Sequence, residues 1–246
     1  MPARHLYFIM TNTWNRLALL IFAVLSLLVA GELQAGVVVG GTRFIFPADR
    51  ESISILLTNT SQESWLINSK INRPTRWAGG GEASTVPAPL LAAPPLILLK
   101  PGTTGTLRLL RTESDILPVD RETLFELSIA SVPSGKVENQ SVKVAMRSVF
   151  KLFWRPEGLP GDPLEAYQQL RWTRNSQGVQ LTNPTPYYIN LIQLSVNGEA
   201  LSNAGVVPPK SQRQTSWCQA IAPCHVAWRA INDYGGLSAK KEQNLP

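Results

Sequence analysis

Histidine and cysteine are scarce in this sequence, with two of each among 246 residues. A scaffold held by several disulfides is therefore excluded, as are most metal clusters built from these residue types. Charged residues are also few, at 16%, whereas apolar residues make up 44%. A chain with this balance can bury a core, so an intrinsically disordered protein is excluded. The length suggests one or two domains, at roughly 100–200 residues each.

The apolar run near the N-terminus, Leu17 to Ala30, is too short to span a bilayer as a helix, which needs about 20 residues. Arg4 and Arg16 precede this run, and small residues up to Ala35 follow it. A positive start, a short apolar segment and a small-residue site are typical of a secretory signal peptide. We predict a signal peptide over residues 1–35, cleaved after Ala35. Cleavage after Ala30 and an uncleaved membrane anchor are the alternatives.

Export would place Cys218 and Cys224 in an oxidising compartment, where the only pair of cysteines is expected to form a disulfide. A redox or metal pair is the alternative, although the spacing is not C-x-x-C. The loop closed by this disulfide is short, so the chain-entropy model gives it only roughly 2–3 kcal/mol. We expect the bridge to staple one hairpin and not to organise the fold.

Proline and glycine, with 19 and 17 residues, punctuate short segments rich in β-branched and aromatic residues. This pattern is typical of an all-β fold, and helical signals are weak. Asn197-Gly198 is a hairpin-turn signal. Strands are predicted over 52–60, 96–99, 106–110, 124–132 and 142–154, then near 170–174, 179–182, 187–196, 212–217 and 225–231.

The segment 155–163, between these two groups of strands, holds three prolines and two glycines. Such a composition cannot extend a central strand, so the segment is the best domain boundary. We therefore predict two immunoglobulin-like β-sandwich domains, over 36–156 and 163–246, joined by a linker over 157–162.

Apolar residues occupy alternate positions at the start of the segment 142–154, which is the longest predicted strand. Val142, Val144 and Met146 therefore share one face of this strand. An ordinary sandwich strand explains the pattern, and on the pattern alone that reading is favoured. The alternative is a strand that lends its apolar side chains to a partner by β-strand addition.

The segment 117–125, closed by Val132-Pro133, resembles the signature of periplasmic pilus chaperones of the chaperone–usher pathway in Gram-negative bacteria. The resemblance extends over nearly all of 36–236. It implies two immunoglobulin-like sandwiches in an L-shaped arrangement with an interdomain cleft, and it favours strand addition for the segment after 142. Six further segments agree in order, namely 42–46, 93–96, 99–102, 150–156, 183–188 and 231–236.

The resemblance implies that this chain binds pilin subunits in the periplasm by donor-strand complementation and delivers them to an outer-membrane usher. A subunit that lacks its last strand exposes an apolar groove and open sheet edges, and would aggregate. By resemblance Val142, Val144 and Met146 fill that groove. Family members can also self-associate to hide this strand when no subunit is bound. No ATP, other cofactor or metal is implied.

Arg43 and Lys151 match two basic residues that bind the terminal carboxylate of the subunit in the family. A carboxylate held by two cations in a partly enclosed cleft would fix the register of the added strand. From their positions alone, a pair of solvated surface charges is the alternative.

Glu122, Arg155 and Asp233 match a family trio thought to bridge the two domains. Their charges suit a small ion network across the linker, which would set the angle between the domains. The alternative is that Glu122 pairs with Arg121 or Arg111.

The chain also departs from the family pattern. Glu126 stands where the family usually has an aromatic residue, and Ser128 stands where it usually has Asn. The chain ends soon after Gly236, so we expect the last strand to be short or missing. The short connection over 134–140 resembles the short-loop subclass, which commonly builds rod-like adhesive pili.

Neither catalysis nor nucleic-acid binding is expected. After signal cleavage His225 is the single histidine, and no nucleophile motif, phosphate loop or metal-ligand cluster accompanies it. The net charge of +6 is spread along the chain, without a Lys/Arg run that would suggest nucleic acid.

The competing function is a secreted two-domain β-sandwich adhesin or carbohydrate-binding module, with tryptophans as a sugar platform. Four tryptophans lie in or beside predicted strands, where core packing is the expected role. These are Trp77, Trp154, Trp172 and Trp228.

Overall fold

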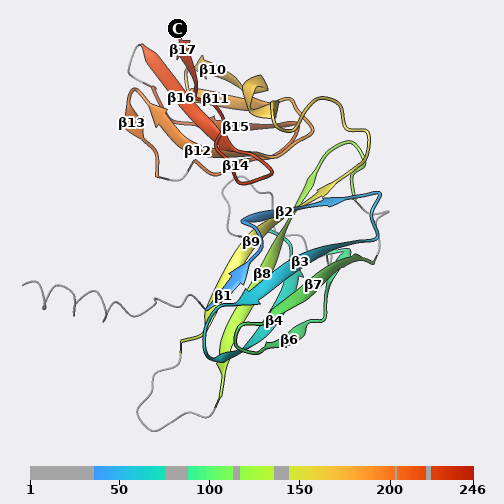
Figure 1. Ribbon diagram of the computed structural model, residues 1–246. Helices are drawn as coiled ribbons and strands as arrows, with labels where there is room; N and C mark the ends of the chain where they lie inside the picture. Colours follow the sequence, from blue (N-terminus) through green and yellow to red (C-terminus); the bar gives the residue numbers. More distant parts are fainter. Residues whose placement is uncertain (1–35, 76–87, 113–116, 136–143, 203, 220–222) are drawn as a thin grey trace, which may run out of the picture. The chain divides into compact units, whose positions relative to one another are not determined.

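The computed structural model describes residues 36–246 except 76–87, 113–116, 136–143, 203 and 220–222 (Figure 1). These residues form two β-sandwiches, the first from β1–β9 and the second from β10–β17, so the predicted all-β fold is confirmed. The short 3-10 helix η1 (Ala166–Gln169) precedes β10. Within the described ranges, no helix is long and apolar enough to cross a membrane.

The first sandwich packs a four-stranded sheet, with the order β1-β3-β7-β5, against a five-stranded sheet, with the order β2-β9-β8-β4-β6. The first sheet contains β1 (Val37–Val39), β3 (Ser52–Asn59), β5 (Leu90–Ala93) and β7 (Thr104–Arg111). The second contains β2 (Arg43–Pro47), β4 (Ser64–Asn72), β6 (Leu96–Leu99), β8 (Thr123–Ser134) and β9 (Met146–Arg155). Alternate residues of these strands, such as Leu57, Leu107, Phe125 and Leu152, are fully buried between the sheets.

The first two strands, β1 and β2, belong to different sheets of this sandwich. β1 pairs with β3 in one sheet, whereas β2 runs parallel to β9 in the other. Gly40 and Gly41 make the step between them, since the Gly40 N–H donates to the Leu56 carbonyl and the Gly41 N–H donates to the Val39 carbonyl. As a result, β2 covers only the second half of β9, from Lys151 to Arg155.

The second sandwich has sheets with the orders β10-β11-β15 and β13-β12-β16-β17, and β14 pairs with β12. The first contains β10 (Arg171–Asn175), β11 (Gly178–Asn183) and β15 (Ser211–Thr215). The second contains β12 (Ile189–Val196), β13 (Glu199–Ala200), β14 (Val206–Val207), β16 (Cys224–Ile231) and β17 (Lys241–Leu245). The predicted hairpin turn at Asn197-Gly198 joins β12 to β13, and both residues have the positive φ, 52° and 84°, that a type I′ turn requires.

Tryptophans fill the cores of both sandwiches. Trp172 and Trp228 have ring centroids 5.4 Å apart in the second core, and Trp154 stacks on Phe46 at 5.3 Å in the first. All three tryptophans are at most 4% exposed. The expected core role is therefore confirmed for them, while Trp77 lies outside the described residues. Buried indoles offer no sugar platform.

The predicted disulfide between Cys218 and Cys224 is present, but its expected place in a hairpin is wrong. Cys218 follows β15 and Cys224 begins β16, and these two strands belong to different sheets. The bridge therefore closes the connection from one sheet to the other at one end of the sandwich. Strands adjacent in sequence do not pair where the chain crosses from one sheet to the other, as it does between β15 and β16.

Several strand predictions also need correction. The sequence does not predict β1, β4, β5, β13 or β14, although β4 is a central strand between β8 and β6. β17 is neither short nor missing, since its 5 residues pair with β16 from Lys241 to Leu245. β9 begins at Met146 and not at residue 142, so β8 is longer, with 12 residues against 10.

The place of the disulfide predicts its contribution to stability. The bridged cysteines are 6 residues apart, so the chain-entropy model gives about 2 kcal/mol. Replacing both cysteines by serine should lower the free energy of unfolding by about this amount, measured by urea denaturation. Reduction of the wild-type protein should give a matching shift, and an unchanged midpoint in both experiments would contradict the estimate.

Candidate functional site

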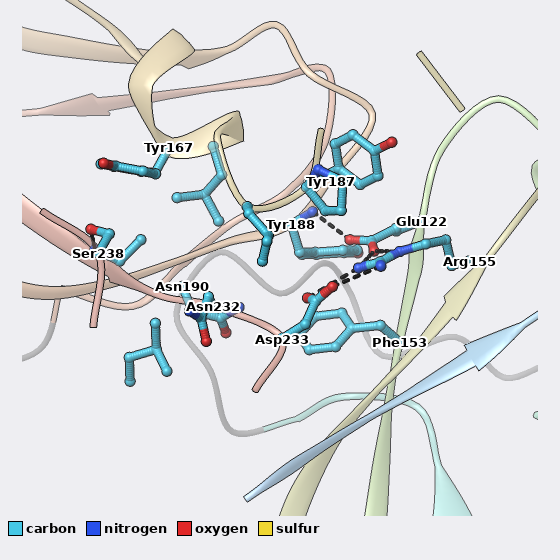
Figure 2. Close-up of a pocket in the computed structure, with 15 residues that line it drawn as sticks. Glu122, Phe153, Arg155, Tyr167, Tyr187, Tyr188, Asn190, Asn232, Asp233 and Ser238 are labelled. Carbon is cyan, nitrogen blue, oxygen red and sulfur yellow. Dashed lines mark hydrogen bonds and ion pairs between the residues drawn. The ribbon is translucent and has the colours of Figure 1, made fainter. Parts of the chain in front are cut away.

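Arg155, the last residue of β9, lies between two carboxylates from distant parts of the chain (Figure 2). Its Nε donates to Glu122 Oε1 at 2.7 Å, while Nη1 and Nη2 donate to the two Asp233 oxygens at 2.7 and 3.1 Å. Glu122 precedes β8 in the first sandwich, and Asp233 follows β16 in the second. The structure thus brings together the trio singled out in the sequence, and Arg121 pairs instead with Asp120 at 2.9 Å.

Glu122 is the most deeply buried member of this trio, with only 3% exposure. Its second oxygen accepts the backbone N–H of Tyr188 at 2.7 Å, so both carboxylate oxygens have partners. Burial raises the pKa of the Glu122 carboxyl to about 7, although Arg155 and the Tyr188 N–H act in the opposite direction. Burial of the Glu122 carboxylate is therefore costly, and its charged form depends on the cation of Arg155.

Arg155 keeps its charge in this setting. Burial acts to lower its pKa, but the hydrogen bond to Asp233 and the charges of Glu122 and Asp233 outweigh burial and raise it. The guanidinium also lies 5.5 Å from the centroid of the Tyr187 ring, a cation–π geometry. A permanent cation thus connects residues of both sandwiches.

A tight turn after β16 holds Asp233 in position. The Asn232 side-chain oxygen accepts the backbone N–H groups of Tyr234 and Gly236 at 3.1 and 2.8 Å. Gly235 has a φ of 83°, and a Cβ at this position would lie 2.9 Å from Thr42 Oγ1, next to Arg43. The positive φ favours glycine at this position, since a side chain there would be strained.

Apolar contacts accompany the ion network. Leu124 and Phe153 from the first sandwich form a buried cluster with Val206 from the second, and Ile45 and Tyr188 pack against it. The Phe153 and Tyr188 rings lie 5.7 Å apart. The ions are therefore partly shielded from water, which strengthens their attraction.

Arg43 and Lys151 lie directly opposite each other on β2 and β9. Arg43 is 9% exposed, its Nη1 donates to the Ile231 carbonyl at 3.0 Å, and its Nε is buried without a hydrogen-bond partner within the described part of the chain. Burial lowers the pKa of Arg43, while burial and the Arg43 charge lower the pKa of Lys151 to about 8. Two neighbouring, half-desolvated cations make a nearby anion electrostatically favourable.

Of the two predicted apolar knobs that the structure describes, one lies in a strand. Met146 is the first residue of β9 and is 53% exposed, whereas Val144 precedes the strand and is 62% exposed. Val142 lies outside the described residues. The predicted strand start is wrong for 144 and 145, because the pairing of β9 with β8 begins only at Met146 and Ser131.

One edge of β9 is open over its first half. β8 pairs with the strand from Met146 to Trp154, but β2 reaches only Lys151 to Arg155 on the other side. Across the described ranges, no further strand pairs with Met146–Phe150. This edge presents backbone N–H and C=O groups to another strand. Phe150 and Leu152 pack on the core of the first sandwich, so alternation places Met146 on that same face.

The two departures from the family pattern lie on β8. Glu126 is 5% exposed, and its Oε1 accepts the Thr75 backbone N–H at 2.7 Å, so the carboxylate fixes the chain that follows β4. Its Cα is in register with Lys151, and Ser128 is in register with Val149. The connection on which the short-loop subclass rests, 134–140, lies mostly outside the described residues.

Sequence reasoning missed a second ion pair between the sandwiches. Lys210 Nζ lies 2.6 Å from Asp120 Oδ2, and hydrogen bonds from Arg121 and Lys210 hold the pKa of Asp120 well below its usual range. Lys210 has a φ of 49° in the turn between β14 and β15. No sequence signal marks this contact, and its solvent exposure makes it a weak one.

Two family models for pilus-assembly chaperones match successive parts of this chain. Residues 36–160 match the family described as "Pili and flagellar-assembly chaperone, PapD N-terminal domain". Residues 165–242 match "Pili assembly chaperone PapD, C-terminal domain". The sequence is 98% identical to the fimbrial chaperone YcbF of Escherichia coli K12, over 96% of this chain and 100% of that protein. It is 33% identical to the chaperone protein FimC of the same strain, over 89% of each chain.

Solved structures are also similar. The SafB chaperone in complex with the SafA pilin of Salmonella enterica gives a TM-score of 0.72 at 28% identity, over 87% of this chain and 98% of that one. The E. coli chaperone DraB gives a TM-score of 0.71 at 28% identity, over 86% and 97%.

The ion trio predicts unequal costs for its members. Arg155→Ala should lower the free energy of unfolding by about 3–5 kcal/mol, because it leaves Glu122 buried without its cation. Asp233→Asn should cost about 1 kcal/mol or less, because that carboxylate is more exposed. Arg121→Ala, in an exposed pair, is the matched control and should change little. Urea denaturation measures all three, and equal midpoints for Arg155→Ala and Arg121→Ala would contradict the account.

Proposed function

The chain belongs to the pilus-assembly chaperones, and from this membership we propose that it captures pilin subunits in the periplasm, keeps them from aggregating and delivers them to an outer-membrane usher. A solved relative, SafB, is in complex with the SafA pilin. The observation that carries the proposal for this chain is the open edge of β9 over Met146–Phe150.

Strand addition at this edge supplies the binding energy. A pilin that lacks one strand would pair its own open edge with β9, and backbone hydrogen bonds would replace those to water. Met146, with Val144 and Val142 before it, would enter the apolar groove of the subunit. Each large apolar side chain that becomes buried contributes roughly 1.5–3 kcal/mol. No bond is broken in this process, so we propose no catalytic step.

Arg43 and Lys151 give the added strand its register. Both lie where β2 begins to cover β9, at the inner end of the open edge. A subunit strand that extends along Met146–Phe150 would therefore arrive with its end beside these cations. Its terminal carboxylate would relieve the repulsion between them, and a shifted strand would lose this contact.

The periplasmic location requires export of the chain. We propose that residues 1–35 are a signal peptide removed after Ala35. The N-terminal family match begins at residue 36, which supports this boundary.

Substitutions on the two faces of β9 test the donor strand. Met146→Glu should abolish recovery of a co-expressed pilin from a periplasmic extract, because it places a charge in the apolar groove. Arg147→Glu is the matched control, since the neighbouring side chain points to the other face. Co-purification measures both, and equal pilin recovery with both variants would contradict the assigned face.

The lowered pKa of Lys151 predicts a pH dependence of carboxylate capture. A carboxylate favours the protonated lysine, so affinity for a free-acid pilin peptide should be full below about pH 7. It should fall about tenfold towards pH 9, as Lys151 loses its proton around pH 8.

Lys151→Arg provides the control, because a guanidinium stays charged over this range. Its affinity should stay constant from pH 7 to pH 9 in fluorescence anisotropy titrations. If wild type and Lys151→Arg follow the same profile, Lys151 is not the titrating anchor.

A further inference from the structure

A hollow in the second sandwich opens beside Lys151, with about 530 Å³ of empty space that is partly open to solvent. Its walls come from β12, from Leu201, Ser202, Ala204 and Gly205, and from the end of β16. Most of the lining is apolar, as with Leu201, Ala204, Val206 and Ile231.

An interruption in the pairing of β12 creates this hollow. β14 pairs with Ile189 and Asn190 and β13 pairs with Ser195 and Val196, so the middle of β12 lacks a strand on that side within the described residues. The register with β16 also shifts between Ile192 and Ser195, and Gln193 has a φ of 50°. Such a bulge bends a strand and redirects its side chains.

Two hydrogen bonds frame the opening. The Leu201 N–H donates to the Leu194 carbonyl at 2.8 Å, and the Leu191 N–H donates to the Gly205 carbonyl at 3.1 Å. Leu201 and Gly205 are thus each held to β12 by a backbone hydrogen bond.

The hollow is continuous with the cation pair. Ile231 lines it, and the Ile231 carbonyl accepts the hydrogen bond from Arg43 Nη1. Lys151 lines it directly. Asn190 is a further lining residue, 7% exposed, and its Oδ1 is buried without a hydrogen-bond partner among the described residues. The site therefore combines cations at its edge, one unsatisfied buried amide and an apolar wall.

We propose that this hollow receives the side chain of the last residue of the captured subunit and selects subunits that end in an apolar residue. The inference rests on the proposed function, since it takes the terminal carboxylate to lie between Arg43 and Lys151. The Cα that bears this carboxylate also bears the side chain, which must then leave the strand close to the two cations. An apolar side chain gains by burial there, whereas a polar one such as Asn gives up water at several atoms and meets one buried acceptor, Asn190 Oδ1, which replaces only part of that water.

Labelled peptides that differ only in the last residue test this selection. We would use a fluorescein-labelled peptide of alternating apolar residues with a free carboxylate, ending in Leu, in its polar counterpart Asn, or in Gly. Fluorescence anisotropy with the purified protein should show the Leu-ended peptide binding at least about tenfold more tightly than the Asn-ended one. Equal affinity for all three peptides would overturn the proposal.

A pocket-filling variant tests the location. The test variant is Ser202→Trp, because Ser202 is an exposed residue of the lining. The matched control is Ser176→Trp, on the exposed turn between β10 and β11. Ser202→Trp should remove the preference for Leu and leave the Gly-ended peptide unaffected, while Ser176→Trp should change neither. A preference that persists in Ser202→Trp would overturn the assignment to this hollow. Circular dichroism checks that both variants fold.

Amidated peptides separate this inference from the function on which it rests. If the free acid binds better than the amide but the last side chain has no effect, the hollow does not bind that side chain, while Arg43 and Lys151 still bind the carboxylate. If acid and amide bind equally, the anchor itself fails, and the inference fails with it.

Discussion

The unequal pairing of β9 is the constraint on which the rest of the structure depends. β8 pairs with the strand from Met146 to Trp154, but β2 pairs only with Lys151 to Arg155. The cause lies at Gly40 and Gly41, where the chain leaves one sheet and enters the other. If the first strand continued in a single sheet beside β9, the edge would be closed and no partner strand could add to it.

One strand thus carries three kinds of interaction in order. Its exposed start bears Met146, its middle bears Lys151 beside Arg43, and its end bears Arg155 between Glu122 and Asp233. The open part offers backbone pairing, the cations can hold a chain end, and Arg155 connects the second sandwich to the same strand. Because all three lie on one element, their spacing is fixed by the rise of a β-strand.

The ion trio and the cation pair differ in electrostatic terms. Arg155 has two carboxylates within 3.1 Å, and its pKa is raised. Arg43 and Lys151 face each other, and burial lowers both pKa values. The first arrangement joins opposite charges and stabilises the fold, whereas the second joins like charges, to which the proposed function assigns the terminal carboxylate of the subunit.

The sequence predicted the all-β class, the two sandwiches and most strands, because alternation and turn residues are local signals. Asn197-Gly198 is an example, since its turn type follows from two residues. The trio of Glu122, Arg155 and Asp233 came from resemblance, because no local pattern joins residues so far apart.

Other features depend on tertiary pairing, which the sequence does not display. The start of β9 was predicted too early because alternation at 142–146 does not say where a neighbouring strand exists. The disulfide was placed in a hairpin because the change of sheet between β15 and β16 leaves no mark in the sequence. The contacts of Glu126 with Thr75 and of Lys210 with Asp120 need the folded geometry to be seen.

Amide hydrogen exchange of β9, measured with and without a pilin, tests the central claim most directly. In the free monomeric protein, outward-facing amides within Met146–Phe150 should exchange fast, while amides of β8 should be protected. Pilin capture should slow exchange in Met146–Phe150 strongly, because a new strand takes up these N–H groups. If capture leaves this exchange unchanged, the subunit binds elsewhere and the account of an open edge on β9 is wrong.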